Sequence, residues 1–147
     1  MPEKTILLVE DNPADVTLTL RAMKRANIAN ELIVARDGVE ALDYLFGTGQ
    51  YSERDPSQLP VVVLLDLKLP KIDGIEVLKR IRSNPVTELV PVVVLTSSKE
   101  QSDVAACYEY KCNSYVRKPV DFNQFAEAVK QLGLYWLVLN EPPKSKS

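Results

Sequence analysis

The chain has 147 residues, of which 46% are hydrophobic and 26% charged, as expected for one compact globular domain with a sizeable core. Its net charge of -2 and pI near 5.3 argue against nucleic-acid binding, which usually requires a basic surface. No apolar run approaches the roughly 18 residues of a membrane span, and the N-terminal apolar run is too short for a signal peptide. We therefore expect a cytoplasmic location.

The chain contains no histidine, which excludes histidine-based catalysis or metal binding by its own residues. It has two cysteines, Cys107 and Cys112, and their spacing matches no common metal-binding pattern. We expect both thiols to be reduced, as in most cytoplasmic proteins.

Short apolar runs alternate with amphipathic helical patterns through the first half of the chain. Residues 5–9 (TILLV) and 32–35 (LIVA) predict two strands. Asn12-Pro13 opens the helix after the first strand, with an apolar stripe at Val16, Leu20 and Met23. A second helix begins at Asp37-Gly38 and runs to Phe46.

Residues 47–60 are polar and rich in turn-forming residues, and a loop of this length is long for an α/β protein. The stretch that follows, 61–70 (VVVLLDLKLP), is a continuous apolar run interrupted by Asp66 and closed by a proline. Such a run predicts a strand that is buried on both faces. The loop is expected to enter this strand at the end opposite Asp66, where it would serve a partner or a dimer contact rather than catalysis.

Two further strands and three helices are predicted in the second half of the chain. A third helix begins at Asp73-Gly74 and ends at Asn84-Pro85, and residues 92–95 form a fourth strand that ends in Thr96. The fourth helix spans 99–110 with Val104, Ala105 and Tyr108 inward. Residues 114–117 form a fifth strand, and a fifth helix begins near Asp121 and is extended or followed by the apolar segment 134–139.

Each predicted helix start carries a side-chain acceptor followed three residues later by Asp, Glu or Gln. This pattern resembles the capping box, in which the two side chains reciprocally bind free backbone N–H groups. The five pairs are Asn12 with Asp15, Asp37 with Glu40, Asp73 with Glu76, Ser98 with Gln101, and Asp121 with Gln124.

Strands that alternate with helices predict a parallel sheet covered by helices on both faces. We expect an α/β, doubly wound, five-stranded sheet in the order 2-1-3-4-5, with its switch point between the first and third strands. Residues 1–147 are predicted to form a single domain, with a core of about 4–133 and a C-terminal extension at 134–147.

Polar residues follow the predicted strands at the edge where such sheets bind ligands. Each alone has an ordinary explanation: Glu10-Asp11 as a turn, Thr96 as a strand-end cap, Lys118 as a surface lysine. Together they would converge with Asp66 in one shallow pocket. Three carboxylates so close require a neutralising cation, and their oxygens suit Mg²⁺. Asp66 is then the candidate nucleophile toward a phosphoryl group, whose oxygens Thr96 and Lys118 would hold.

The chain resembles the response-regulator receiver domains of two-component signalling, which have a flavodoxin-like (CheY-like) fold. The matching segments are residues 7–12 (LLVEDN), 64–70 (LLDLKLP), 73–74 (DG), 93–98 (VVLTSS) and 115–119 (YVRKP). The resemblance implies a phosphoacceptor rather than an enzyme, with at most slow autophosphorylation and autodephosphorylation.

By the same resemblance, Asp66 is the phosphoacceptor, and the Mg²⁺ ligands are Glu10, Asp11, Asp66 and the backbone carbonyl of Lys68. Thr96 and Lys118 would bind the acyl phosphate. Thr96 and Tyr115 would form the conformational switch. No other cofactor is implied, and the Lys118-Pro119 peptide bond would be cis.

The resemblance also implies a sensor histidine kinase as the phosphodonor. The long loop and the aromatic segment 134–139 are similar to the stand-alone regulators that are paired with bacterial phytochromes. Such relatives dimerise through the fourth helix, fifth strand and fifth helix, although residues 134–139 are equally consistent with packing on their own core. Two rivals are a haloacid-dehalogenase-type phosphatase, which would need a second acid where this chain has Lys68, and a pseudo-receiver that only binds a partner.

Overall fold

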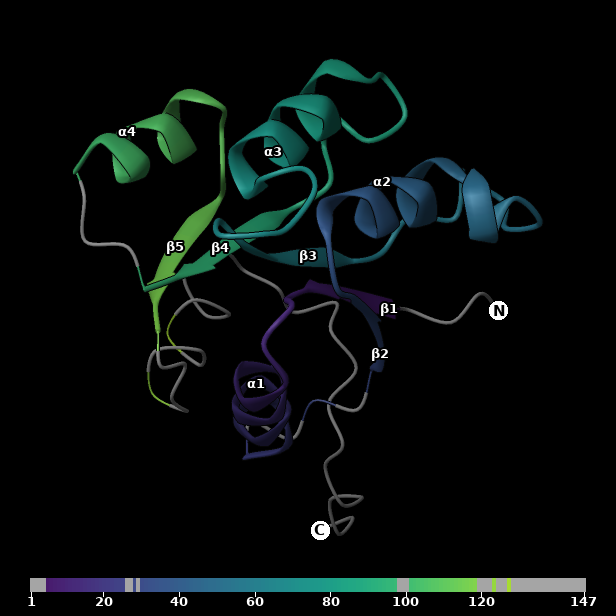
Figure 1. Cartoon of the computed structure of the whole chain (residues 1–147). Helices are drawn as coiled ribbons and strands as arrows, with labels where there is room; N and C mark the ends of the chain where they lie inside the picture. The colour runs from purple at the N-terminus through teal and green to yellow at the C-terminus, as the bar shows by residue number, and fades with distance from the viewer. Residues whose placement is uncertain are drawn as a thin grey trace, which may run out of the picture.

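Five parallel strands form one sheet in the computed structural model, which describes residues 5–25, 28, 30–97, 101–118, 123 and 127. The strands are β1 (Thr5–Val9), β2 (Glu31–Ala35), β3 (Val62–Asp66), β4 (Val92–Thr96) and β5 (Ser114–Arg117). Their order, β2-β1-β3-β4-β5, confirms the predicted doubly wound sheet (Figure 1). β1 and β3 are neighbours, so the predicted switch point lies between them.

Helices cover both faces of this sheet. They are α1 (Pro13–Arg25), α2 (Gly38–Phe46), α3 (Gly74–Ser83) and α4 (Gln101–Glu109). In Figure 1, α2, α3 and α4 lie above the sheet and α1 lies below it. Asn123 and Glu127 have helical backbone, but most of the predicted fifth helix and all of the segment 134–139 lie outside the described residues.

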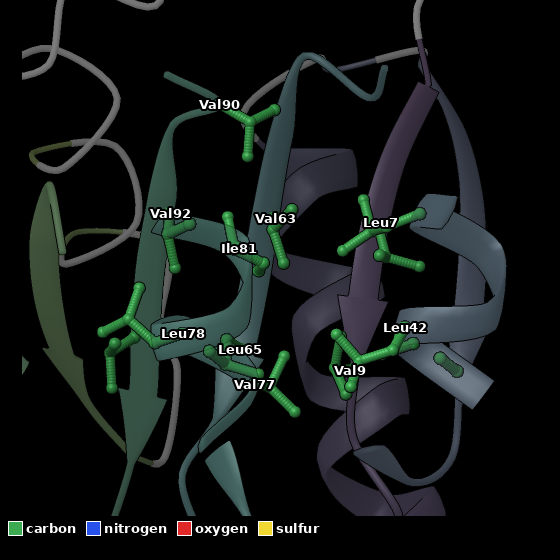
Figure 2. Packing of buried hydrophobic residues seen from close by; sticks show 14 of the residues in the cluster. Leu7, Val9, Leu42, Val63, Leu65, Val77, Leu78, Ile81, Val90 and Val92 are labelled. Atoms are coloured by element: carbon green, nitrogen blue, oxygen red, sulfur yellow. The ribbon is translucent and has the colours of Figure 1, made fainter. Parts of the chain in front are cut away.

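The strands send alternate side chains into two separate cores, as the two-residue period of a strand requires. Leu7 and Leu65 belong to the core beneath α2 and α3, which Figure 2 shows. Ile6 and Leu64 belong to the core against α1. Every residue of β3 is buried, which confirms the prediction of a strand covered on both faces.

Val16 and Met23 of α1 are buried as predicted, but one predicted position of α1 and two of α4 are wrong. Leu20 of α1 is 43% exposed, and Thr19 is buried in its place. The Thr19 hydroxyl donates a hydrogen bond to the carbonyl oxygen of Asp15 at 2.9 Å, so its burial leaves no unpaired polar group. In α4, Ala105 and Tyr108 are exposed, whereas Cys107 is fully buried. Cysteine packs as a small apolar side chain, which explains the shifted face.

The caps confirm one half of the predicted pairing. Asp37 Oδ1 accepts a hydrogen bond from the backbone N–H of Glu40 at 2.8 Å, and Asp73 Oδ1 accepts one from Glu76 at 2.9 Å. Asn12 Oδ1 similarly accepts from the N–H of Ala14 at 2.9 Å and, more weakly, of Asp15 at 3.4 Å.

The second half of the prediction is wrong for these three pairs. The side chain three residues after the cap does not bind the backbone N–H of the cap residue, because it has another partner. Glu76 pairs with Arg80, Glu40 accepts from the N–H of Arg36, and Asp15 contacts Lys118. The two remaining pairs include Ser98 and Asp121, which lie outside the described residues.

The long loop 47–60 is organised around Arg54. The Arg54 guanidinium lies 4.0 Å from the centre of the Tyr44 ring and donates a hydrogen bond to the carbonyl oxygen of Tyr44 at 2.6 Å. Tyr51, in the short 3₁₀ helix η1 (Gly49–Tyr51), packs edge-on against Tyr44 with ring centres 5.1 Å apart. The loop leads into β3 at the end opposite Asp66, as predicted.

The loop between β3 and α3 rests on the first residues of α2. A Cβ atom on Gly38 would collide with the carbonyl oxygen of Ile72 and lie 2.7 Å from the Ile72 Cβ. The Lys71 ammonium lies 3.4 Å from Asp37 Oδ2, and Lys71 has a φ of 68°, a conformation unusual for a residue other than glycine. Gly38 therefore allows two backbones to approach closely beside the site.

We expect Gly38→Ala to lower the free energy of unfolding by about 1 to 3 kcal/mol, because the added methyl group meets backbone that cannot easily move. Alanine is the better helix former, so an exposed helix position would show the opposite sign. Denaturant unfolding measures the change. Val39→Ala, at the next and more exposed position, is the control and should shift stability by less than about 0.5 kcal/mol. A Gly38→Ala protein at least as stable as the wild type would contradict this packing.

Candidate functional site

Three acidic residues meet at the carboxyl edge of the sheet. Glu10 follows β1, and Asp66 ends the neighbouring strand β3. One carboxylate oxygen from each of Glu10, Asp11 and Asp66 lies within 4.8 Å of the others. Glu10 and Asp66 are 1% and 4% exposed, whereas Asp11 is exposed, so the cluster opens toward solvent on the side of Asp11. The structure thus brings together the three acids that the sequence predicts to converge.

Lys118, directly after β5, places its ammonium inside this cluster. Its Nζ lies 3.0 Å from Asp66 Oδ2 and 3.1 Å from Asp15 Oδ2, and it also pairs closely with Glu10 Oε1. Burial of Lys118 opposes its charge, but hydrogen bonds to Glu10 and Asp66 outweigh burial and raise its pKa above the ordinary value. Lys118 is therefore a fixed cation beside the Asp66 carboxylate.

The buried Glu10 carboxyl has a raised pKa. Burial raises its pKa from 4.5 to about 7, against the lowering effect of its hydrogen bond with Lys118, and the nearby Asp66 charge raises it further. Glu10 Oε2 also accepts a hydrogen bond from the backbone N–H of Asn12 at 3.2 Å. The cluster thus carries more negative charge than one ammonium can balance.

The raised Glu10 pKa predicts that the metal-free protein loses stability as the pH rises. The folded chain binds a proton on Glu10 more tightly than the unfolded chain, so this contribution is complete below pH 4.5 and is lost through pH 7. We expect the free energy of unfolding to fall by about 1 to 3 kcal/mol between pH 5 and 8. Denaturant titrations in the presence of a chelator measure this change.

Glu10→Gln is the control for this pH dependence, since it removes the titrating group and keeps the side-chain shape. The chain has no histidine, so no other side chain ordinarily titrates in this interval. A pH dependence that persists unchanged in Glu10→Gln would show that Glu10 is not its source.

The turn after β3 brings backbone close to Asp66. Asp66 Oδ1 accepts a hydrogen bond from the N–H of Lys68 at 3.2 Å, and the N–H of Gly74 donates to the carbonyl oxygen of Leu67 at 2.9 Å. The Lys68 side chain is exposed, and its ammonium lies 3.8 Å from Asp103 Oδ2 of α4. A groove of about 450 Å³ runs beside this turn, lined by Asp11, Leu67, Lys68, Leu69, Pro70, Asp73, Ile75 and Asp103.

The predicted switch residues lie on β4, which neighbours β3, and on β5, the strand beyond it. Thr96 ends β4, where Leu95 pairs with Asp66, but its side chain lies outside the described part of the structure. Tyr115 on β5 is half-buried and packs against the core beneath α2 and α3. Burial raises the Tyr115 pKa, so its hydroxyl is neutral at pH 7. Pro119 also lies outside the described residues, and with it the predicted cis bond.

Asp15 is a member of the cluster that the sequence interpretation missed. It lies in the first turn of α1 and pairs with Lys118, which is 103 residues away in the chain. The sequence pattern assigned it to a capping pair with Asn12. Asp15 lies four residues after Asp11, at the start of a helix that follows a strand end. This position could have indicated that its carboxylate lies near the site.

The residues of the cluster fit a divalent metal ion. Glu10, Asp11 and Asp66 supply three converging carboxylates, and among the described residues Lys118 is the only ammonium that contacts them. Carboxylate oxygens are the ligands that Mg²⁺ and Mn²⁺ prefer, and a divalent cation would offset most of the excess negative charge.

Comparisons with known proteins agree with this geometry. The family model described as "Response regulator receiver domain" matches residues 6–130. The response regulator Rcp1 of Synechocystis sp. is 43% identical over 136 residues, which cover 92% of this chain and 90% of Rcp1.

Two solved structures extend the comparison to three dimensions. The bacteriophytochrome response regulator RtBRR is 53% identical with a TM-score of 0.86, over 97% of this chain and 85% of that one. The crystal structure of the Mn²⁺-bound form of Rcp1 is 40% identical with a TM-score of 0.76, over 97% of this chain and all of that one.

These matches do not favour the phosphatase or the pseudo-receiver. Among the described residues, no helix has the length and apolar character needed to cross a bilayer. Receiver domains accept phosphoryl groups and are generally not enzymes. The family match, the strand order and the cluster of acids around one lysine agree, and the chain belongs to the response regulator receiver domains.

Proposed function

We propose that Asp66 accepts a phosphoryl group from a phosphohistidine of a sensor histidine kinase. The observation that carries this proposal is the position of the Lys118 ammonium, 3.0 Å from Asp66 Oδ2, within the cluster of Glu10, Asp11 and Asp66. Mg²⁺ is the proposed metal, held by these three acids and by the backbone carbonyl of Lys68. Support for a divalent ion comes from the excess of carboxylates and from the Mn²⁺-bound form of Rcp1.

In the proposed reaction, a carboxylate oxygen of Asp66 attacks phosphorus and forms an acyl phosphate. The phosphorus–nitrogen bond of the donor breaks, and its electron pair returns to the imidazole, which then takes a proton from water. Lys118 offsets the charge on the transferred phosphoryl oxygens. A bound Mg²⁺ would supply further neutralisation of the same charge. Each chain accepts one phosphoryl group, and any autophosphorylation or autodephosphorylation is slow.

The acyl phosphate adds about 1.5 to 2 negative charges at the end of β3. Thr96 and Tyr115 are the proposed residues that respond, because Thr96 ends the adjacent strand and Tyr115 lies on the strand beyond it. The surface formed by α4, β5 and the fifth helix would then change its partner affinity, as a shift between two conformations.

The proposed phosphodonor is a phytochrome-type histidine kinase, and the same surface is the proposed homodimer contact. The 53% sequence identity to a bacteriophytochrome response regulator supports the proposed phosphodonor. Tyr108 of α4, which is 55% exposed, supports the proposed homodimer contact. Sedimentation with and without a phosphodonor tests the dimer, which a monomer under both conditions would exclude.

We further propose that residues 1–147 act as a single cytoplasmic domain without nucleic-acid or membrane contacts.

The test of phosphoryl acceptance is to incubate the purified chain with candidate kinases and with a small phosphoramidate donor, with and without Mg²⁺. We expect one phosphoryl group per chain, dependent on Mg²⁺ and removed by hydroxylamine, which cleaves acyl phosphates. Peptide mapping should locate it on Asp66. A phosphoryl group that resists hydroxylamine, or that maps to another residue, would refute the proposal.

A further inference from the structure

Asp15 is a fourth carboxylate at the site, and the proposed reaction assigns it no role. Its Oδ2 lies 3.1 Å from Lys118 Nζ, on the ammonium that also contacts Glu10 and Asp66. Asp15 is not among the three acids whose oxygens converge within 4.8 Å of one another. It therefore faces the lysine rather than the candidate metal position.

A divalent ion at the cluster would change how strongly each of the three acidic partners attracts the Lys118 ammonium. Glu10 and Asp66 belong to the proposed metal ligand set, so their negative charge would be shared with the metal. The metal would also repel the nearby ammonium. Asp15 is the one described contact of Lys118 that lies outside this ligand set, and it keeps its full attraction for the lysine.

The backbone of Asp15 is held firmly enough to act as an anchor. Its N–H lies 3.4 Å from Asn12 Oδ1, and its carbonyl oxygen accepts a hydrogen bond from the buried Thr19 hydroxyl at 2.9 Å. The Asp15 side chain is 26% exposed and Lys118 only 10%, so water weakens their attraction less than at an open surface. The carboxylate cannot follow Lys118 far from the site.

We propose that Asp15 is a positioning residue that keeps the Lys118 ammonium beside Asp66 when a divalent metal occupies the acid cluster. The incoming phosphoryl group would then meet a cation that is already in place. This role rests on the proposed function of Asp66 and Lys118. The first turn of α1 would therefore take part in the reaction, although it is far from β5 in the sequence.

The decisive variant is Asp15→Asn, which keeps the side-chain shape and removes the charge. At a metal concentration that saturates each protein, we expect its initial phosphorylation rate by a small phosphoramidate to fall about tenfold, the effect of losing one charged hydrogen bond. Asp15→Glu, which keeps the charge, should recover much of the rate. Glu76→Gln is the matched control, since Glu76 lies in the first turn of α3 and pairs only with Arg80 among the contacts described.

A second measurement needs no phosphorylation. Mass spectrometry can follow the acetylation of Lys118 by an amine-reactive reagent with and without Mg²⁺. We expect Mg²⁺ to leave Lys118 protected in the wild type and to increase its labelling severalfold in Asp15→Asn. A protein that had merely lost stability would be labelled more at many lysines, and regardless of Mg²⁺.

The two proposals fail in different ways. An Asp15→Asn protein with wild-type phosphorylation rate and wild-type Lys118 protection at saturating metal would refute the positioning role alone. A wild-type chain that accepts no phosphoryl group from any donor would refute the proposed function. In that case, Lys118 labelling still decides whether Asp15 holds the lysine in the metal-bound protein.

Discussion

Asp66→Asn is expected to abolish phosphoryl acceptance, lowering the initial rate by about 1000-fold or more. The amide has the same shape as the carboxylate but lacks the negative oxygen that must attack phosphorus. Lys118 keeps its contacts with Glu10 and Asp15 in this variant, so the fold and the position of the lysine should survive. Radiolabelled phosphotransfer, followed with a kinase and separately with a small donor, measures the loss.

Asp55→Asn is the matched control for this experiment. Asp55 is an exposed acid in the loop 47–60, whose entry into β3 lies at the opposite end of the strand from Asp66. Its rate should equal that of the wild type. Phosphorylation of Asp66→Asn with an unchanged yield would show that the phosphoacceptor is a different residue.

Lys118→Met should have the second largest effect, on stability as well as on phosphorylation. It removes the only described cation among Glu10, Asp15 and Asp66 and leaves two nearly buried carboxylates without a counterion. Breaking a buried pair on one side costs about 3 to 5 kcal/mol, and the partial exposure of Asp15 places this site near the lower value. We expect a loss of about 3 kcal/mol without metal, measured by denaturant unfolding.

Divalent metal should restore much of the stability lost in Lys118→Met, because it supplies the missing positive charge. The phosphorylation rate should remain about 100-fold below that of the wild type at saturating metal, since the Lys118 ammonium no longer meets the transferred oxygens. Lys24→Met, at an exposed position in the last turn of α1, controls for the loss of one positive charge. A Lys118→Met protein as stable as Lys24→Met in the absence of metal would contradict the ion pairing described here.

The elements that are predicted well from the sequence are those with strong local signals. β3 combines a continuous apolar run with a length suited to a buried strand, and the residues before α2 and α3 are good helix caps. Because parallel strands end at one edge, the residues that follow them had to be neighbours. The convergence of Glu10, Asp11 and Asp66 therefore follows from the strand assignment.

The errors occur where a local pattern permits two solutions. An apolar stripe through Leu20 and one through Thr19 are both compatible with helical spacing, and the packing of α1 against the sheet decides between them. In α4, Cys107 rather than Tyr108 faces the core, because the packing of the helix within the core beneath α2 and α3 selects the face. These choices depend on contacts between distant segments, which periodicity does not contain.

The sequence by itself determined the strand order, the edge that carries the site and the chemistry of its acids. The physical reason is that the patterns that form strands and helices are local, and that right-handed crossovers leave few orders in which such strands can pair. Only the tertiary structure decided how Lys118 is held, since its partners come from the end of β3, the residue after β1 and the first turn of α1. A side chain's electrostatic partners depend on distances across the fold, and only the structure shows that the first turn of α1 brings Asp15 to Lys118.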